Sequence, residues 1–193
     1  MRPAFAGHAF ASAALGLTLL IWWLTEIRRA LHRRPGATDL DRGSLWLVRG
    51  CAAAAAVLAA LALNVPAADF AFTWPVFALS LLLVWAGVAL RWWCFHTLGR
   101  YFTFSVQASP DQRVIGTGPY AVLRHPSYLA IMLILAGIGA SYGNWLSLGA
   151  LTIIPLFGFV VRIRVEEAAL TAMLGSGYTS FARTRKRLLP FVW

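Results

Sequence analysis

The chain has 193 residues, of which 60% are hydrophobic and only 12% charged, and its formal net charge is +10. That length suits one domain, and the composition is too apolar for a soluble domain of this size, which indicates a polytopic membrane protein. The positive charge does not indicate a nucleic-acid partner, because the arginines cluster at the ends of apolar runs. Cys51 and Cys94 lie in or beside separate apolar runs, so we expect neither a disulfide framework nor a metal site.

Five apolar runs can cross, or nearly cross, a ~30 Å hydrocarbon core at ~1.5 Å per residue. We therefore expect an all-α integral membrane protein with transmembrane spans at residues 5–24, 45–65, 74–95, 126–141 and 145–161. We expect the first run to be a retained span and not a signal peptide, because Trp22, Trp23 and Glu26 stand where a cleavage site needs small residues. The fourth run is long enough if its helix begins at Pro126, since proline is tolerated in a first turn. Pro155 should kink the fifth span.

The charges of the connections predict the orientation of the spans. Basic residues follow the first, third and fifth spans, whereas the second connection carries only Asp69 and the fourth, residues 141–144, carries no charge. We expect the N-terminus outside the cell, the C-terminus in the cytoplasm, and residues 96–125 and 162–193 as cytoplasmic segments. Lys186 is the only lysine among many arginines, which suggests a GC-rich genome and hence a bacterial inner membrane. Arginines of the first connection also suit contact with anionic lipid headgroups.

Two polar motifs flank the last two spans. Residues 118–128 include Arg124-His125-Pro126-Ser127-Tyr128, and residues 162–167 hold two arginines and two adjacent glutamates. A helical hairpin returns the chain to the side that it left, so both motifs should lie at one membrane face. Arg162 and Glu166 are four residues apart and can pair on a helix. Charged groups near the bilayer are costly unless they are paired or functional, so this is either a polar site or an ion pair that ends the last span.

The chain resembles the isoprenylcysteine carboxyl methyltransferase family of integral membrane enzymes over roughly residues 100–191. The order and spacing of short pieces carry the resemblance: Gly118-x-Tyr120, Arg124-His125-Pro126-Ser127-Tyr128, Asn144, Arg162-x-x-x-Glu166-Glu167 and Gly175-x-x-Tyr178. The family is itself similar to the membrane phospholipid methyltransferases, so the resemblance indicates the cofactor better than the acceptor.

The resemblance implies S-adenosylmethionine as cofactor. It places cofactor contacts at Gln107, Gln112, Arg113, Val114, Ile115, Tyr120, His125, Pro126, Ser127, Tyr128, Glu166 and Glu167. Arg162 would be the catalytic, substrate-orienting residue, and Asn144 a second substrate-binding residue. Gln112 stands where the family commonly has histidine. The residue types agree with these roles, because an aromatic face such as Tyr120 suits adenine and the carboxylate of Glu166 suits an ammonium group.

Methyl transfer to a carboxylate needs neither a metal nor a base, because the acceptor is already ionised at neutral pH. An arginine can hold such an acceptor in a fixed plane. We therefore expect methylation of a carboxylate on a lipidic or isoprenylcysteine-like acceptor that enters from the bilayer. Phospholipid or amine N-methylation is the alternative, with His125 or Glu167 as the base that an ammonium acceptor requires. A membrane reductase using NADPH and a non-catalytic scaffold also stay open.

Overall fold

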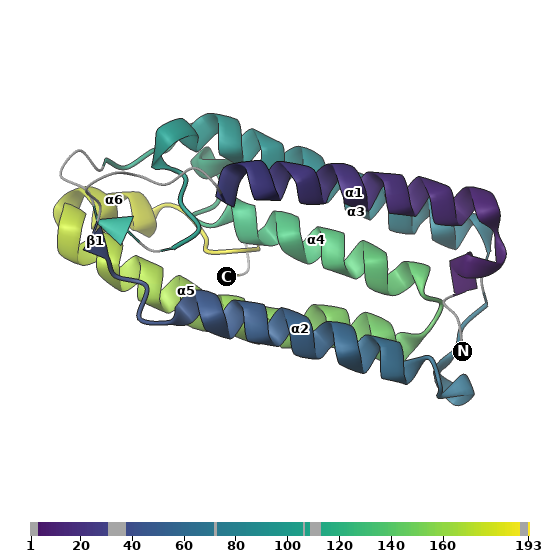
Figure 1. Cartoon of the computed structure of the whole chain (residues 1–193). Helices are drawn as coiled ribbons and strands as arrows, with labels where there is room; N and C mark the ends of the chain where they lie inside the picture. The colour runs from purple at the N-terminus through teal and green to yellow at the C-terminus, as the bar shows by residue number, and fades with distance from the viewer. Residues whose placement is uncertain (1–3, 31–37, 72, 106, 109–112, 190–192) are drawn as a thin grey trace.

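The computed structural model describes residues 4–30, 38–71, 73–105, 107–108, 113–189 and 193. The described residues include five long helices. These helices run up and down along one axis (Figure 1). They are α1 (Ala9–Ala30), α2 (Ser44–Ala62), α3 (Trp74–Leu98), α4 (Pro126–Ser141) and α5 (Trp145–Leu174). Shorter elements are α6 (Ser176–Arg183), the 3-10 helices η1 (Ala4–Gly7), η2 (Pro66–Ala68), η3 (Gly99–Tyr101) and η4 (Gly118–Ala121), and the strands β1 (Thr38–Asp39) and β2 (Gln107–Ala108).

The predicted helical membrane fold is confirmed, with one small addition. The two short strands pair antiparallel, Thr38 opposite Ala108 and Asp39 opposite Gln107, and join the α1–α2 connection to the segment after α3. Four helical segments are long and apolar enough to cross a membrane, namely α1, α2, α5, and α3 together with η3. Helix α4 has 16 residues, or about 24 Å at ~1.5 Å per residue. The positions at which the five helices enter and leave the membrane stay predictions, as does a kink at Pro155.

Local chemistry sets the bounds of the last two long helices. Pro126 occupies the first turn of α4, where its missing N–H breaks no helical hydrogen bond. Asn144 caps α5, because its Oδ1 accepts a hydrogen bond from the backbone N–H of Ser147 at 3.0 Å. Helix α5 then continues past residue 161, the predicted end of the span, to Leu174. Its last three turns carry the second polar motif beyond the predicted span.

The long helices lie in the spatial order α1, α3, α4, α5, α2, each packed on the next (Figure 1). Glycines bring α3 and α4 close together. A Cβ at Gly87 would lie 2.6 Å from the carbonyl oxygen of Ala130, and a Cβ at Gly137 would lie 2.5 Å from that of Ser80. Small residues allow this approach of two backbones in lipid. The contact fixes the start of α4, and with it the first motif, against α3.

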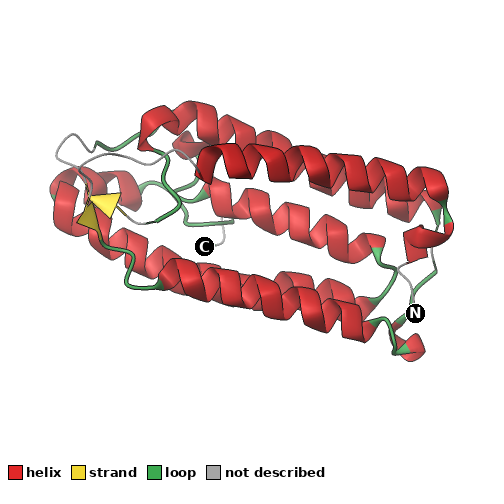
Figure 2. Ribbon diagram, viewed as in Figure 1, coloured by secondary structure: helices red, strands yellow, loops and turns green. Residues whose placement is uncertain are grey.

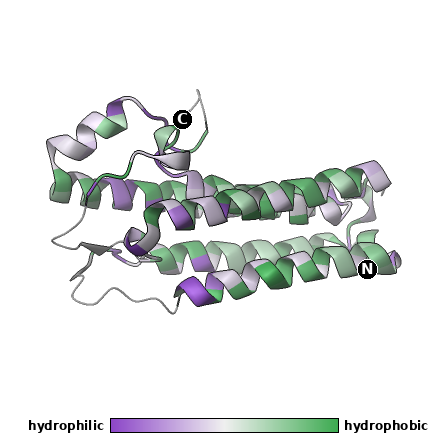
Figure 3. Cartoon of the chain, turned by 90° about the horizontal axis from the view of Figure 1, so that it is seen from above, coloured by the Kyte–Doolittle hydropathy of each residue, from purple (hydrophilic) through white to green (hydrophobic). Residues whose placement is uncertain are grey.

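The two ends of the bundle differ in polarity. Figure 2 shows most of the loop and both strands at the end where α6 lies, and Figure 3 shows many hydrophilic residues at the same end. The sides of the long helices expose large apolar side chains, among them Phe10, Trp46 and Ile153. Such a surface is typical of helices that face lipid. Because α1, α3 and α5 end, and α2 and α4 begin, at the α6 end, that end gathers both polar motifs.

Candidate functional site

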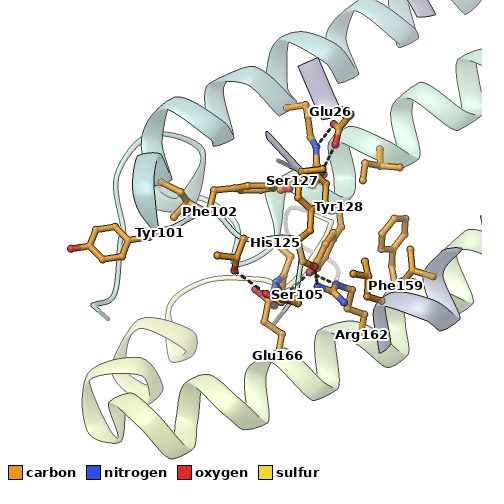
Figure 4. Close-up of a pocket in the computed structure, with 18 of the residues that line it drawn as sticks. Glu26, Tyr101, Phe102, Ser105, His125, Ser127, Tyr128, Phe159, Arg162 and Glu166 are labelled. Carbon is orange, nitrogen blue, oxygen red and sulfur yellow. Dashed lines mark hydrogen bonds and ion pairs between the residues drawn. The ribbon is translucent and has the colours of Figure 1, made fainter. Parts of the chain in front are cut away.

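A cavity of about 460 Å³ lies at the α6 end of the bundle, within the size range of small-molecule sites. Residues of both motifs line it: Tyr120, Arg124, His125, Ser127, Tyr128, Arg162 and Glu166. Apolar residues of α1 and α2 also line it, among them Trp23, Ile27, Leu45 and Val48. Figure 4 shows the polar side chains of α4 and α5 converging on this space. One cavity therefore borders both polar groups and the apolar faces of two candidate spans.

The first motif is held by a tight turn and by the C-terminal segment. Gly118 has φ +55°, and a Cβ there would lie 2.7 Å from Oγ1 of Thr97, so a larger residue would clash with α3. Beyond η4, the backbone N–H of Arg124 donates to the carbonyl of Lys186 at 2.8 Å, and that of His125 to the carbonyl of Arg187 at 2.9 Å. The segment after α6 thus fixes the residues that enter α4.

The hydroxyl of Tyr128 joins the two motifs. Nε of Arg162 donates to it at 2.9 Å, and it donates to Oε2 of Glu166 at 2.6 Å. Arg162 does not form the direct ion pair with Glu166 that their spacing predicted. Its ionic partner among the described residues is Asp41, with Nη1 2.6 Å from Oδ1. A buried guanidinium is drawn to the carboxylate that can be buried with it, and Glu166 keeps part of its surface at the cavity.

Asp41, which sequence reasoning missed, anchors Arg162 from the α1–α2 connection. The carboxylate is buried and also accepts hydrogen bonds from Oγ of Ser44 at 2.9 Å and from the backbone N–H of Leu45 at 2.8 Å. Burial acts to raise the pKa of Asp41, but the Leu45 N–H and the charge of Arg162 outweigh it, so the pKa lies below its ordinary value. An aspartate just before an apolar run, in an arginine-rich connection, was the available signal.

Arg162 is almost fully engaged by the protein. Nη1 also donates to Oγ of Ser44 at 3.0 Å, and Nη2 donates to the carbonyl of Phe104. A guanidinium has five N–H groups, and four of them have partners among the described residues. The guanidinium is therefore fixed in position and has one N–H group left to offer to a ligand.

Glu167 ties three segments together and does not line the cavity. Its Oε1 accepts from Nη1 of Arg124 at 2.7 Å, and its Oε2 accepts from Nε of Arg187 at 2.9 Å. Nε2 of His125 lies 3.3 Å from Oε1, and Nδ1 of the same ring lies 3.6 Å from Oε2 of Glu166. Glu167 is thus the centre of an ion-pair cluster in which two guanidiniums occupy its oxygens, and its contact with the cofactor stays a prediction.

A second buried ion pair completes the wall of the cavity. Arg91, only 3% exposed, meets Glu26 of α1 in a two-point contact, with Nε to Oε1 at 2.8 Å and Nη2 to Oε2 at 3.0 Å. Its Nη1 donates to the carbonyl and to the hydroxyl of Ser127. Spacing along the chain gives no signal for this pair, whose members come from different helices. It couples α1 and α3 to the first turn of α4.

The cavity gathers six of the predicted site residues: Tyr120, His125, Ser127, Tyr128, Arg162 and Glu166. Pro126 is buried at the start of α4, and the backbone of Gln107 pairs with that of Asp39. The cavity is not lined by Arg113, Val114 or Ile115. Tyr101 does line it, and the guanidinium of Arg113 lies 5.3 Å from the centre of the Tyr101 ring. Gln112 is outside the described residues.

Asn144, the second expected substrate-binding residue, lies at the opposite end of the bundle from Arg162. The two residues are 18 positions apart on α5, or about 27 Å at ~1.5 Å per residue. Asn144 is fully buried, and its Nδ2 donates to Oδ1 of Asp69 at 2.7 Å and to the carbonyl of Ala62 at 3.2 Å. Its amide holds the α4–α5 turn to the α2–α3 connection, and substrate binding by this residue stays a prediction.

Comparison with known proteins relates the chain to membrane methyltransferases. The sequence model of the Isoprenylcysteine carboxyl methyltransferase (ICMT) family matches residues 78–172. A probable protein-S-isoprenylcysteine O-methyltransferase from Oryza sativa subsp. indica is 30% identical over 121 residues, which cover 62% of this chain and 63% of the rice protein. The protein-S-isoprenylcysteine O-methyltransferase of Saccharomyces cerevisiae is 32% identical over 116 residues, 59% of this chain and 48% of the yeast protein.

The fold has a solved relative as well. The structure of the eukaryotic intramembrane Ras methyltransferase ICMT superposes on this chain with a TM-score of 0.65 at 22% identity. The superposition covers 95% of this chain and 63% of that one. The chain thus spans less than two thirds of the length of these relatives. The likeness concerns the helical arrangement, and it extends over nearly all of this chain.

Proposed function

Since the chain belongs to the isoprenylcysteine carboxyl methyltransferase family, we propose that it is a membrane methyltransferase that uses S-adenosylmethionine. Its acceptor is a carboxylate on a lipidic or isoprenylcysteine-like molecule. The observation that supports this proposal is the shared cavity, which borders the polar motifs on one side and apolar residues of α1 and α2 on the other. A water-soluble cofactor and an acceptor with a lipid tail can meet only in a site with both kinds of wall.

The cavity residues fit S-adenosylmethionine. The side chain of Glu166 is 29% exposed and can take the α-ammonium, since Tyr128 uses only one of its oxygens. The rings of Tyr120, Tyr101 and Phe102 line the same space and offer faces for adenine. When bound, the cofactor supplies a methyl group on a positively charged sulfur. The chain's own part is to hold and orient both molecules and to exclude water.

Arg162 is the residue that we assign to the acceptor carboxylate. Asp41 and Tyr128 hold its guanidinium in place, so its remaining N–H group has a fixed direction. Trp23 and Leu45 line the apolar side of the cavity, where the lipid part of the acceptor would lie. A carboxylate acceptor is already ionised at neutral pH, so no residue has to remove a proton from it.

N-methylation of an amine is the second candidate, and it depends on a base. Glu167 is poorly suited, because two guanidiniums stabilise its charged form and occupy both of its oxygens. The position of His125 favours the amine candidate, because a base is required and this side chain lines the cavity with its ring nitrogens near Glu166 and Glu167. The nature of the product separates the two candidates.

The test uses protein purified in detergent and S-adenosylmethionine labelled in its methyl group. An isoprenylated cysteine and phosphatidylethanolamine serve as alternative acceptors. We expect label in the isoprenylcysteine, and alkali should release it as methanol, because esters hydrolyse and N-methyl groups do not. Alkali-stable label in the phospholipid would establish the amine candidate instead. Calorimetric binding of NADPH without binding of S-adenosylhomocysteine would refute both.

Glu166→Gln tests the cofactor site directly. Loss of a charged hydrogen-bond partner, about 1.5–3 kcal/mol, should weaken S-adenosylhomocysteine binding about ten- to hundred-fold. Asp69→Asn is the matched control, because it makes the same carboxylate-to-amide change at the far end of the bundle. If both variants bind as the wild type does, the ammonium contact is wrong.

We also propose that the α6 end faces the cytoplasm of a bacterial cell and that the N-terminus lies outside its inner membrane. The support is the charge of the connections, since basic residues follow α1, α3 and α5 at that end. A reporter fused after Trp193 tests the orientation. Activity of that reporter on the outer side alone would overturn it.

A further inference from the structure

A second hollow, of about 410 Å³, lies between α1 and α3 and is separate from the cavity described above. It is lined by Thr25, Arg28, Arg29, Trp92, Phe95 and His96, and it shares no lining residue with the first cavity. Glu26 and Arg91 lie next to these residues in the sequence but line the first cavity. The last turns of α1 and α3 thus line two separate hollows with different side chains. We call the second hollow the α1–α3 groove.

The walls of the α1–α3 groove are held by contacts between the two helices. Nε1 of Trp92 donates to Oγ1 of Thr25 at 3.2 Å. The guanidinium of Arg29 lies over the ring of Phe95, 5.2 Å from its centre, and that ring is only 3% exposed. The groove therefore has a fixed aromatic floor with a cation at its edge.

The described residues that line the α1–α3 groove are basic or uncharged. They include two arginines and a histidine and no carboxylate. Glu26, the acidic residue of α1, is held by Arg91 in the two-point ion pair and lies on the wall of the other cavity. Guanidinium groups match the oxygens of phosphate in geometry as well as in charge. A ligand with a phosphate group suits this site.

The surroundings place the groove at headgroup depth. Trp92, which lines the groove, is 39% exposed, and Trp93, the next residue of α3, is more than half exposed. Tryptophans gather where the hydrocarbon core meets the headgroups, and both helices are long and apolar enough to cross that core. A phosphate at this depth belongs to a lipid whose acyl chains can lie along the apolar sides of α1 and α3.

We propose that the α1–α3 groove binds the headgroup phosphate of an anionic phospholipid, with Arg28 and Arg29 as its partners and the ring of Trp92 against the glycerol and upper acyl chain. The site is separate from the methyl-transfer cavity, and the proposal does not depend on the proposed reaction. Zwitterionic phospholipids carry a compensating ammonium, so the groove should prefer lipids with net negative charge.

The test is native mass spectrometry of delipidated protein titrated with phosphatidylglycerol and, separately, with phosphatidylcholine. The wild type should bind phosphatidylglycerol more tightly. Arg28→Gln with Arg29→Gln should weaken this binding about five-fold for each arginine, or about thirty-fold for the pair. Arg164→Gln with Arg183→Gln is the control, since these exposed residues lie outside the groove and the net charge changes equally. Thermal unfolding shows whether each variant is folded.

Three results would overturn the proposal: equal affinity of the wild type for the two lipids, an equal loss of affinity in the control pair, or displacement of the lipid by millimolar inorganic phosphate. The last would assign the groove to free phosphate. A second measurement needs no arginine variant. Phosphatidylglycerol with brominated acyl chains should quench less tryptophan fluorescence in Trp92→Phe than in the wild type, and equal quenching would also contradict the site.

Discussion

Asp41→Asn tests whether Arg162 acts as a positioned guanidinium. The carboxylate of Asp41 lies 2.6 Å from Nη1 of Arg162 and accepts the backbone N–H of Leu45 at 2.8 Å. Asparagine has the same shape and can still offer one oxygen to Arg162. It loses the charge, and its amide NH₂ then faces the N–H of Leu45, where one donor meets another.

The structure allows the size of the effect to be estimated. Replacing a charged hydrogen bond to Arg162 by a neutral one costs about 1–2 kcal/mol, since the two kinds contribute about 1.5–3 and 0.5–1.5 kcal/mol. Loss of the contact with Leu45, which caps the start of α2, adds about 1–2 kcal/mol. The free energy of unfolding should therefore fall by about 2–4 kcal/mol. If the about 1–2 kcal/mol lost at Arg162 is lost from the alignment of the acceptor in the transition state, kcat/KM falls about five- to thirty-fold.

The assay compares kcat/KM for an isoprenylcysteine acceptor with the affinity for S-adenosylhomocysteine, both on the same folded Asp41→Asn sample. We expect the first to fall and the second to stay near the wild-type value, because Asp41 does not line the cavity. Asp69→Asn is the control: it also removes a carboxylate partner, that of Asn144 at 2.7 Å, and should leave kcat/KM unchanged. A folded Asp41→Asn enzyme with wild-type kcat/KM would refute the positioning role.

The pH dependence of this variant gives an independent check. Burial acts to raise the pKa of Asp41, but the Leu45 N–H and Arg162 hold it below the ordinary value of 3.8. A depressed folded-state pKa means that the carboxylate contributes stability above the unfolded-state pKa and loses it as the pH falls through the folded-state pKa. The difference in stability between wild type and Asp41→Asn should stay constant from about pH 8 to pH 5 and shrink only below about pH 4. A difference that already shrinks at pH 6 would contradict this assignment.

Two further changes test the packing and the buried charges. Gly137→Ala places a Cβ 2.5 Å from the carbonyl oxygen of Ser80 and should lower the free energy of unfolding by about 1–3 kcal/mol. Gly149→Ala is the control, because the nearest atom to its Cβ would be 4.0 Å away. It should be neutral or should stabilise the protein by up to about 1 kcal/mol. Equal unfolding midpoints in detergent would rule out the close α3–α4 contact. Glu26→Gln leaves the buried charge of Arg91 without its ionic partner and should cost about 3–5 kcal/mol in the same measurement; a loss below about 1 kcal/mol would show that the pair contributes little.

The helices could be predicted from the sequence because their signals are local. For α4, the apolar run, the uncharged break at residues 141–144 and a proline that a first helical turn tolerates predict a helix over residues 126–141. The structure has the same bounds. For α5 the end of the apolar run and the end of the helix differ, because the charges after residue 161 end the predicted span but do not end a helix. Arginine and glutamate are both good helix formers, and α5 continues to Leu174.

Part of the site was predictable for the same reason. Tyr120, His125, Ser127 and Tyr128 belong to one continuous motif, so a local turn is enough to keep them together, and the structure does place them on one cavity. The return of the chain through α4 and α5 brings Arg162 and Glu166 to that cavity, as the hairpin argument expected. Asn144, which belongs to the uncharged break between the two helices, lies at the closed end of the same hairpin.

The ionic partners were decided only by the tertiary structure. Arg162 had a carboxylate four residues away and yet pairs with Asp41, 121 residues distant in the sequence, and Arg91 pairs with Glu26 from another helix. Helix and turn propensities act over a few residues, so the sequence by itself determined the elements and the contiguous motif. A buried charge instead requires whichever opposite charge the packed helices bring within reach, and only the helix packing determines which residue that is.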